Sequence, residues 1–308
     1  MDWRFYKTLF CYIDGLTSSW GRYIVMEVSF DSHLGGKMVS KKQSSLEKIS
    51  EPELSYFELQ AYWGVSKPHM GGLKATRELI ELCHIDKGIY VLDVGCGVGV
   101  TPCYIAKRHG SRVVGVDISE KMVDRARQRA KREGVEDKVE FRVGDAQSLS
   151  FGDDLFDVVI GESVIAFVED KRKGINEYVR VTRPGGYVGL NEATWIKTPP
   201  PTELVEYISR ITGAKLETSD SWQELLESSG LKDTEVKTYK INALSQFIGE
   251  MRYLGLRDSL TAGYRFLSLY IRRSNFRRYL KEAWPPKELY RSYFKYLGYG
   301  IYVGRKGT

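Results

Sequence analysis

Short apolar runs alternate with stretches of helical spacing over much of the chain. The runs that predict strands lie at 91–94, 112–117, 156–161 and 187–191, and alternation of apolar and polar residues predicts a further strand at 139–143. The stretches that predict helices between them lie at 101–109, 120–133 and 171–182, with Ser119 as the expected N-cap of the second. Strands that alternate with helices of roughly 10–15 residues indicate a parallel sheet with right-handed crossovers. The pattern therefore predicts an α/β fold.

Glycines gather where the first predicted strand ends. Residues 91–99 read Val-Leu-Asp-Val-Gly-Cys-Gly-Val-Gly, and a helix-forming stretch follows at once. A strand, a tight turn and a helix N-terminus in this order let a nucleotide-like ligand touch the backbone. The next strand ends in Asp117, about twenty residues beyond the glycines, where a ribose-binding carboxylate sits in such units.

The spacing of the glycines separates two classes of ligand. Dinucleotide-binding proteins use Gly-x-Gly-x-x-Gly, whereas this chain has Gly95, Gly97 and Gly99 at alternate positions, with Asp93 just before them. A carboxylate there repels a pyrophosphate and suits a ligand that carries an ammonium group. A nicotinamide-dependent oxidoreductase is therefore disfavoured. A glycine-rich turn of some other α/β protein stays open.

The glycine segment resembles the first motif of class I S-adenosylmethionine-dependent methyltransferases. Two later motifs follow in the order of that family, Gly-Asp-Ala at 144–146 and Arg-Pro-Gly-Gly at 183–186. The second is expected to stop a helix and to turn before the strand at 187–191. The resemblance covers roughly 55–241 and the last dozen residues. It is closest to the group of quinone, tocopherol, sterol and small-amine methyltransferases.

This resemblance implies a Rossmann-like, doubly wound, seven-stranded sheet that is mostly parallel with an antiparallel last strand. Its sixth and seventh strands are expected at 232–241 and 297–306, separated by a helical insertion. The resulting division is a disordered or mis-started extension, an N-terminal helical lid, the cofactor-binding core, a basic aromatic cap and the last strand. These segments are 1–40, 41–87, 88–241, 242–296 and 297–308. Met38 in the first segment reads like a natural start.

The same resemblance implies that S-adenosylmethionine is the cofactor, and it assigns roles to single residues. Asp93 would orient the amino group, and Asp117 would accept from both ribose hydroxyls. Ile118 would pack on the adenine, while Asp145 and the N–H of Ala146 would bind it at its edge. The expected cofactor contacts are Asp93, Gly95, Cys96, Gly97, Gly99, Asp117, Ile118, Met122, Asp145, Ala146, Glu162, Tyr62 and Trp63.

Each of these assignments has a plainer alternative. Asp145 could serve only as a turn residue, and Glu162 only as a solvated loop acid. We interpret Cys96 as a small residue that the turn tolerates rather than as a nucleophile. Tyr62 and Trp63 could face the sulfonium by cation–π attraction, or they could merely pack a helix on the sheet.

Methyl transfer requires the acceptor atom to approach the methyl group in line with the bond that breaks, in a pocket that excludes water. A general base is needed only for a carbon acid or a hydroxyl acceptor. The candidate catalytic residues are Glu162, His69 and Tyr62, and a purely structural His69 is the alternative. No cluster of metal-ligand spacing stands out in the sequence, so no metal is expected.

Composition sets the broad class. The chain has 308 residues, of which 42% are hydrophobic and 28% charged, which is ordinary for a soluble protein. The four cysteines form no Cys-x-x-Cys pair, which argues against a zinc site or a disulfide framework and favours a reducing, cytoplasmic setting. We find neither a signal-peptide core nor an apolar run long enough to span a bilayer.

The predicted cap concentrates the positive charge. Residues 245–296 hold 11 Lys/Arg and 4 Asp/Glu, a net of +7 against +6 for the whole chain, together with twelve aromatic residues. Phe247, Met251 and Leu254 share one helical face. Such a segment suits a roof over an apolar acceptor, an anionic membrane surface or a solvated basic face. Nucleic acid is disfavoured because no recognised RNA-binding module accompanies the charge.

The function expected from these patterns is S-adenosylmethionine-dependent methyl transfer to a small-molecule or lipid-like acceptor, with prenyl, quinone and sterol types among the candidates. Two alternatives remain: an NAD(P)-dependent oxidoreductase, and a non-catalytic cofactor-binding protein of the same fold. Peripheral association with a membrane is compatible with the cytoplasmic setting.

Overall fold

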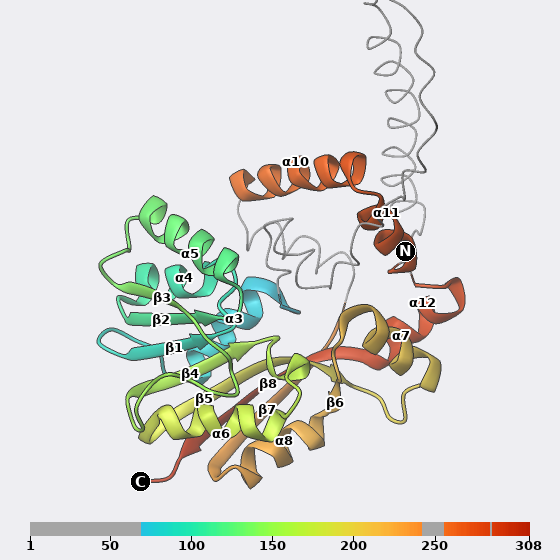
Figure 1. Ribbon diagram of the computed structural model, residues 1–308. Helices are drawn as coiled ribbons and strands as arrows, with labels where there is room; N and C mark the ends of the chain where they lie inside the picture. The colour runs from blue at the N-terminus through green and yellow to red at the C-terminus, as the bar shows by residue number, and fades with distance from the viewer. Residues whose placement is uncertain (1–68, 242–255, 284) are drawn as a thin grey trace, which may run out of the picture. The chain divides into compact units, whose positions relative to one another are not determined.

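All seven predicted strands are present in the computed structural model, which describes residues 69–241, 256–283 and 285–308 (Figure 1). Their bounds are β1 (Tyr90–Val94), β2 (Arg112–Asp117), β3 (Val139–Val143), β4 (Phe156–Glu162), β5 (Thr182–Trp195), β7 (Leu231–Lys240) and β8 (Leu297–Lys306). An eighth strand, β6 (Glu217–Thr218), pairs with β5. The sequence did not predict it, because two residues show no alternation.

The strands lie in the order β3-β2-β1-β4-β5-β8-β7. The first five strands of the chain pair in parallel, and β8 runs antiparallel between β5 and β7. The predicted mostly parallel sheet with an antiparallel last strand is therefore confirmed, with the short β6 in addition. The order reverses at β1, so the carboxyl ends of β1 and β4 flank a switch point, where open α/β sheets bind ligands.

Helices cover both faces of this sheet (Figure 1). On one face lie α3 (Gly72–Leu82), α4 (Val100–His109) and α5 (Glu120–Glu133), and on the other lie α6 (Lys171–Val181) and α8 (Ser219–Ser228). Leu79, Ile105 and Val123 are fully buried in the first layer, and Ile175 and Trp222 in the second. Complete burial of such side chains stabilises a fold by roughly 1.5–3 kcal/mol each.

Ser119 stands at the N-cap of α5 as predicted, although its side chain makes no capping hydrogen bond. One other local prediction differs from the structure. The Arg-Pro-Gly-Gly segment at 183–186 belongs to β5 instead of ending before it. Strand pairing passes from Thr182 opposite Phe156 to Tyr187 opposite Val158, so the predicted turn is an irregularity within a longer strand.

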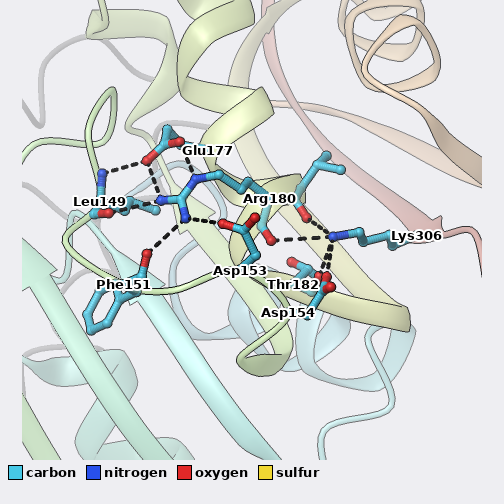
Figure 2. Close-up of polar contacts among 9 residues, drawn as sticks. Leu149, Phe151, Asp153, Asp154, Glu177, Arg180, Thr182 and Lys306 are labelled. Carbon is cyan, nitrogen blue, oxygen red and sulfur yellow. Dashed lines mark hydrogen bonds and ion pairs between the residues drawn. The ribbon is translucent and has the colours of Figure 1, made fainter.

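A cluster of hydrogen bonds and ion pairs lies at the amino ends of the parallel strands and joins β8, α6 and the loop before β4. The Lys306 ammonium, at the end of β8, donates to Asp154 (2.7 Å) and to the carbonyl of Val179 in α6 (2.8 Å). Arg180 donates to both oxygens of Glu177 (2.6 and 2.8 Å). Figure 2 shows these contacts around the loop before β4. A cation near the C-terminus of α6 also complements its helix dipole.

The described part of the predicted cap is helical, as expected. It comprises α10 (Leu256–Arg272), α11 (Ser274–Glu282) and α12 (Lys287–Tyr296). Tyr293 of α12 packs with a cluster that contains Leu204 and Ile208 of α7 (Thr202–Thr212). In the described ranges, no helix combines the length and the hydropathy needed to cross a membrane.

Several predictions fall on residues outside the described ranges. They are the extension at 1–40, residues 41–68 of the lid (with Tyr62 and Trp63), and the helical face of Phe247, Met251 and Leu254. The features described here all belong to one compact unit, residues 51–308.

Candidate functional site

The glycine turn, residues 95–99, joins β1 to α4 through left-handed backbone. Gly95, Gly97 and Gly99 have φ angles of 73°, 54° and 76°, which are strained for residues that carry a Cβ. The N–H of Gly95 donates to the carbonyl of Val116 in β2 (2.6 Å). A Cβ at position 99 would lie 2.9 Å from the Cβ of Ala126 in α5. Glycine is therefore required both by the turn and by the close approach of α5.

Asp117 ends β2 beside this turn, and its carboxylate is held by backbone. One oxygen accepts from the N–H of Gly97 (2.9 Å), and the other accepts from the N–H of Ser119 (2.9 Å). Burial raises the pKa of Asp117, while these two hydrogen bonds oppose the rise. Each carboxylate oxygen can accept more than one hydrogen bond, so both remain able to accept from a pair of ligand hydroxyls.

Three carboxylates meet at the carboxyl ends of neighbouring strands. Asp93 in β1 is only 2% exposed. Burial raises its pKa well above the usual range, and the charges of Glu162 and Asp117 raise it further. A cation bound here would favour the charged form of Asp93, whereas a pyrophosphate would add like charge. The electrostatics of the site therefore suit a cationic ligand.

The Glu162 cluster lies at the end of β4 and consists of Glu162, His69, Thr76, Thr101 and Asn191. The carboxylate accepts from Thr101 (2.8 Å), from Thr76 (3.1 Å) and from the amide nitrogen of Asn191 (3.3 Å). Nε2 of His69 lies 3.1 Å from the same carboxylate, and the side chains of His69 and Glu162 are 3% and 5% exposed. The structure thus brings together two of the three predicted catalytic residues, and Glu162 is no solvated loop acid.

The hydrogen bonds of the cluster orient the imidazole of His69. The amide nitrogen of Asn191 faces the carbonyl of Met70 (3.2 Å) and Nδ1 of His69 (2.7 Å). Because an amide nitrogen can only donate a hydrogen bond, Nδ1 of His69 is assigned as the acceptor in the 2.7 Å contact, and Nε2 carries the proton. The carboxylate of Glu162 already contacts four side chains, so it is suited to positioning them. Proton transfer by Glu162 or His69 stays a prediction.

Sequence reasoning missed three members of this cluster. Thr101 follows the glycine turn by two residues, and Asn191 lies directly opposite Glu162 in the pairing of β4 with β5. That register was a usable signal, because both residues end their apolar runs. Thr76 lies in α3, and its part in the cluster depends on tertiary packing that no local pattern shows.

The predicted adenine contacts lie next to Asp117. The N–H of Gly144 donates to the backbone carbonyl of Asp117 (3.1 Å), which joins the two loops. Ile118 is 70% exposed, and Ala146 is buried. One carboxylate oxygen of Asp145 accepts from the N–H of Gln147 (2.9 Å). Asp145 therefore shapes its turn, and its role toward adenine stays a prediction.

Two further predicted contacts, Met122 and Cys96, are buried at the glycine turn. Met122 packs with Val98 and Val100, so it supports the turn. Cys96 is 7% exposed, and burial raises the pKa of its thiol. A thiol that resists ionisation is a poor nucleophile, which agrees with its interpretation as a tolerated small residue. Residues 69–241, 256–283 and 285–308 contain no group of three or more His, Cys, Asp or Glu arranged to hold a metal ion.

A further buried carboxylate, which the sequence did not indicate, supports the loop after β4. Glu192 in β5 is 0% exposed. It accepts from the N–H groups of Val164 (2.9 Å) and Ile165 (2.7 Å). Burial raises its pKa to about 7 despite these hydrogen bonds. The loop that follows Glu162 is thus held by a group that titrates near neutral pH.

Glu192→Gln is expected to remove part of the pH dependence of folding. The native pKa lies above the ordinary value, so the native state binds the proton more tightly. The stability linked to Glu192 is present below the ordinary pKa and is lost as the pH rises through about 7. At pH 8 the free energy of unfolding of the variant should exceed that of the wild type by up to about 3 kcal/mol. Urea unfolding at several pH values measures this difference.

The matched control is Glu224→Gln, which changes an exposed residue of α8 and should follow the wild type at every pH. Parallel pH profiles for Glu192→Gln and the wild type would contradict the account of Glu192.

Comparison with known proteins gives this geometry a context. Residues 92–190 match the family described as "Methyltransferase domain". Phosphoethanolamine N-methyltransferase 1 of Zea mays is 30% identical over 190 residues, which are 61% of this chain and 37% of the maize protein. An uncharacterized protein of Haemophilus influenzae is 30% identical over 59% of this chain and 74% of its own length.

A solved structure shares the fold. Phosphoethanolamine N-methyltransferase 2 of Haemonchus contortus, in complex with S-adenosyl-L-methionine, aligns with a TM-score of 0.63 at 21% identity. The alignment covers 82% of this chain and 57% of the other. The chain thus spans little more than a third of the maize protein it matches and about half of the nematode one.

The glycine turn, the strand order and the matched domain define an S-adenosylmethionine-dependent methyltransferase fold. The chain belongs to the class I S-adenosylmethionine-dependent methyltransferases, and S-adenosylmethionine is the cofactor of that class.

Proposed function

We propose that this protein transfers the methyl group of S-adenosylmethionine to a small-molecule or lipid-like acceptor. The observation that carries the proposal is the meeting of Asp93, Asp117 and Glu162 beside the glycine turn. Negative charge at this point suits a ligand with a sulfonium and an ammonium group. It opposes the pyrophosphate of a nicotinamide dinucleotide.

Each carboxylate has a separate task in this proposal. Asp117, fixed by the N–H groups of Gly97 and Ser119, accepts from the ribose hydroxyls. Asp93 faces the ammonium group and gains its charge as the ligand binds. The buried Glu162 cluster holds the carboxyl ends of β4 and β5 against α3 and α4.

The methyl group is electrophilic because it is attached to a sulfonium when the cofactor is bound. What the chain supplies is binding, alignment and exclusion of water. Burial of Asp93, His69 and Glu162 supports a water-poor site.

One observation supports each of two acceptor classes. The maize relative is named a phosphoethanolamine N-methyltransferase, which makes a small phosphorylated amine the first acceptor to try. The helices between β7 and β8 carry many aromatic side chains, which favours a lipid-like acceptor. Both classes belong in one assay.

The assay supplies S-adenosylmethionine together with phosphoethanolamine, a prenylated quinol or a sterol. We expect S-adenosylhomocysteine to form with at least one acceptor, and that acceptor to gain one methyl group by mass spectrometry. Asp117→Ala should show a strongly raised KM for the cofactor. Cofactor binding without any turnover over a wide panel would instead indicate a non-catalytic protein. Tight binding of NADPH in its place would indicate an oxidoreductase.

A further inference from the structure

One side of α10 exposes a stripe of apolar side chains. Leu260, Tyr264, Leu267 and Ile271 are 69%, 73%, 43% and 59% exposed. Their spacing of four, three and four residues places them on one face over about three turns of helix. Exposed large apolar side chains that form a continuous stripe indicate an interaction surface rather than isolated exposure.

The opposite side of α10 is attached to the core by charge. Asp258 accepts from Arg129 (2.5 Å) and Arg132 (2.9 Å) of α5, and Ala262 is 8% exposed. Arg129, itself buried, also donates to the carbonyl of Val98 in the glycine turn (3.0 Å). The anchored side of α10 therefore carries an ion pair, while the stripe points away from it.

Exposed arginines flank the stripe. Arg257 and Arg272 lie on α10, and Arg277 and Arg278 follow on α11. Residues 256–283 hold seven Lys/Arg and two Asp/Glu, a net of +5 out of +6 for the whole chain. In a two-fold dimer built on this face, each copy would bring the same positive charge to the contact. The charge therefore favours an anionic partner over a second copy.

We propose that the α10 stripe is a docking surface for an anionic lipid bilayer. The helix would lie in the plane of the interface, with the stripe among the acyl chains and the arginines at the headgroups. The bond from Arg129 to Val98 and the ion pair from Arg129 to Asp258 link the docked helix to the glycine turn.

Flotation of the full chain with vesicles tests the proposal. Vesicles of phosphatidylcholine with 30% phosphatidylglycerol should carry the protein upward at low salt, and pure phosphatidylcholine vesicles should carry far less. The double variant Leu260→Glu/Ile271→Glu should lose most of this binding. Replacing Arg257 and Arg272 by Gln should lower the partition coefficient by about 5-fold per residue. All four side chains are exposed, so the variants should fold.

The matched control is Leu155→Glu. Leu155 is 45% exposed and directly precedes β4, at the amino ends of the parallel strands, so this variant should float like the wild type. The proposal is overturned if the wild type stays in the soluble fraction with anionic vesicles, or if the stripe variant floats equally well. It is also overturned if light scattering shows a wild-type dimer that the stripe variant dissociates, since the face would then belong to a second copy.

Discussion

Replacing Asp117 by Ala is expected to weaken the binding of S-adenosylmethionine and S-adenosylhomocysteine by about 100-fold or more. A hydrogen bond to a charged group contributes about 1.5–3 kcal/mol, and two ribose hydroxyls would lose such a bond. A loss of about 3 kcal/mol corresponds to roughly a hundredfold change in Kd. The variant also removes the acceptor for the N–H groups of Gly97 and Ser119, which loosens the turn. Isothermal titration calorimetry measures the effect.

The control for this experiment is Asp124→Ala. Asp124 also lies just beyond β2, in α5, but its side chain is 58% exposed and pairs only with the exposed Arg127 among the described residues. Its removal should leave cofactor affinity unchanged. Equal affinities for Asp117→Ala and the wild type would show that the ribose lies elsewhere.

Replacing Glu162 by Ala is expected to lower the free energy of unfolding by about 3–5 kcal/mol. The substitution leaves the buried side chains of Thr76, Thr101, Asn191 and His69 without their common acceptor. Removing one partner of a buried polar network costs this much because the remaining groups stay desolvated. Urea unfolding with an unchanged m-value would report it.

Glu162→Gln removes the carboxylate charge but keeps the volume of the side chain. Its amide oxygen can still accept from Thr101 and Thr76, but its NH₂ group meets the donors of Asn191 and His69, so an intermediate loss is expected. Glu169→Ala, at an exposed loop position, should have little effect. A loss below about 1 kcal/mol for Glu162→Ala would contradict a network organised around this carboxylate.

β1, β2 and β4 were recoverable because each is an apolar run that parallel pairing buries on both faces. β3 was recoverable from its alternation, since Val139 and Phe141 are buried and Glu140 is exposed. β2 and β3 have the predicted bounds, 112–117 and 139–143. The Arg-Pro-Gly-Gly segment was misplaced because its turn residues lie inside β5, where Gly185 has a φ of 76°. The sequence shows the turn chemistry, but pairing with β4 decides where the strand begins.

Site residues that follow a strand were predictable, and residues that arrive by packing were not. Asp93, Asp117 and Glu162 each lie at or near the carboxyl end of an apolar run, and the structure brings all three to one edge. His69 was named as a candidate, but its pairing with Glu162 joins residues far apart in the sequence and depends on where α3 packs. Glu192 was missed because the predicted strand ends at residue 191, whereas β5 continues to Trp195 and is covered there.

Titration of the wild-type chain with S-adenosylhomocysteine is the most direct test of the site proposed here. Calorimetry should show saturable binding at one site per chain, and NADPH at the same concentration should neither bind nor compete. Absence of binding by S-adenosylhomocysteine to the folded protein, or displacement of it by NADPH, would contradict the assignment of Asp93, Asp117 and the glycine turn to this cofactor.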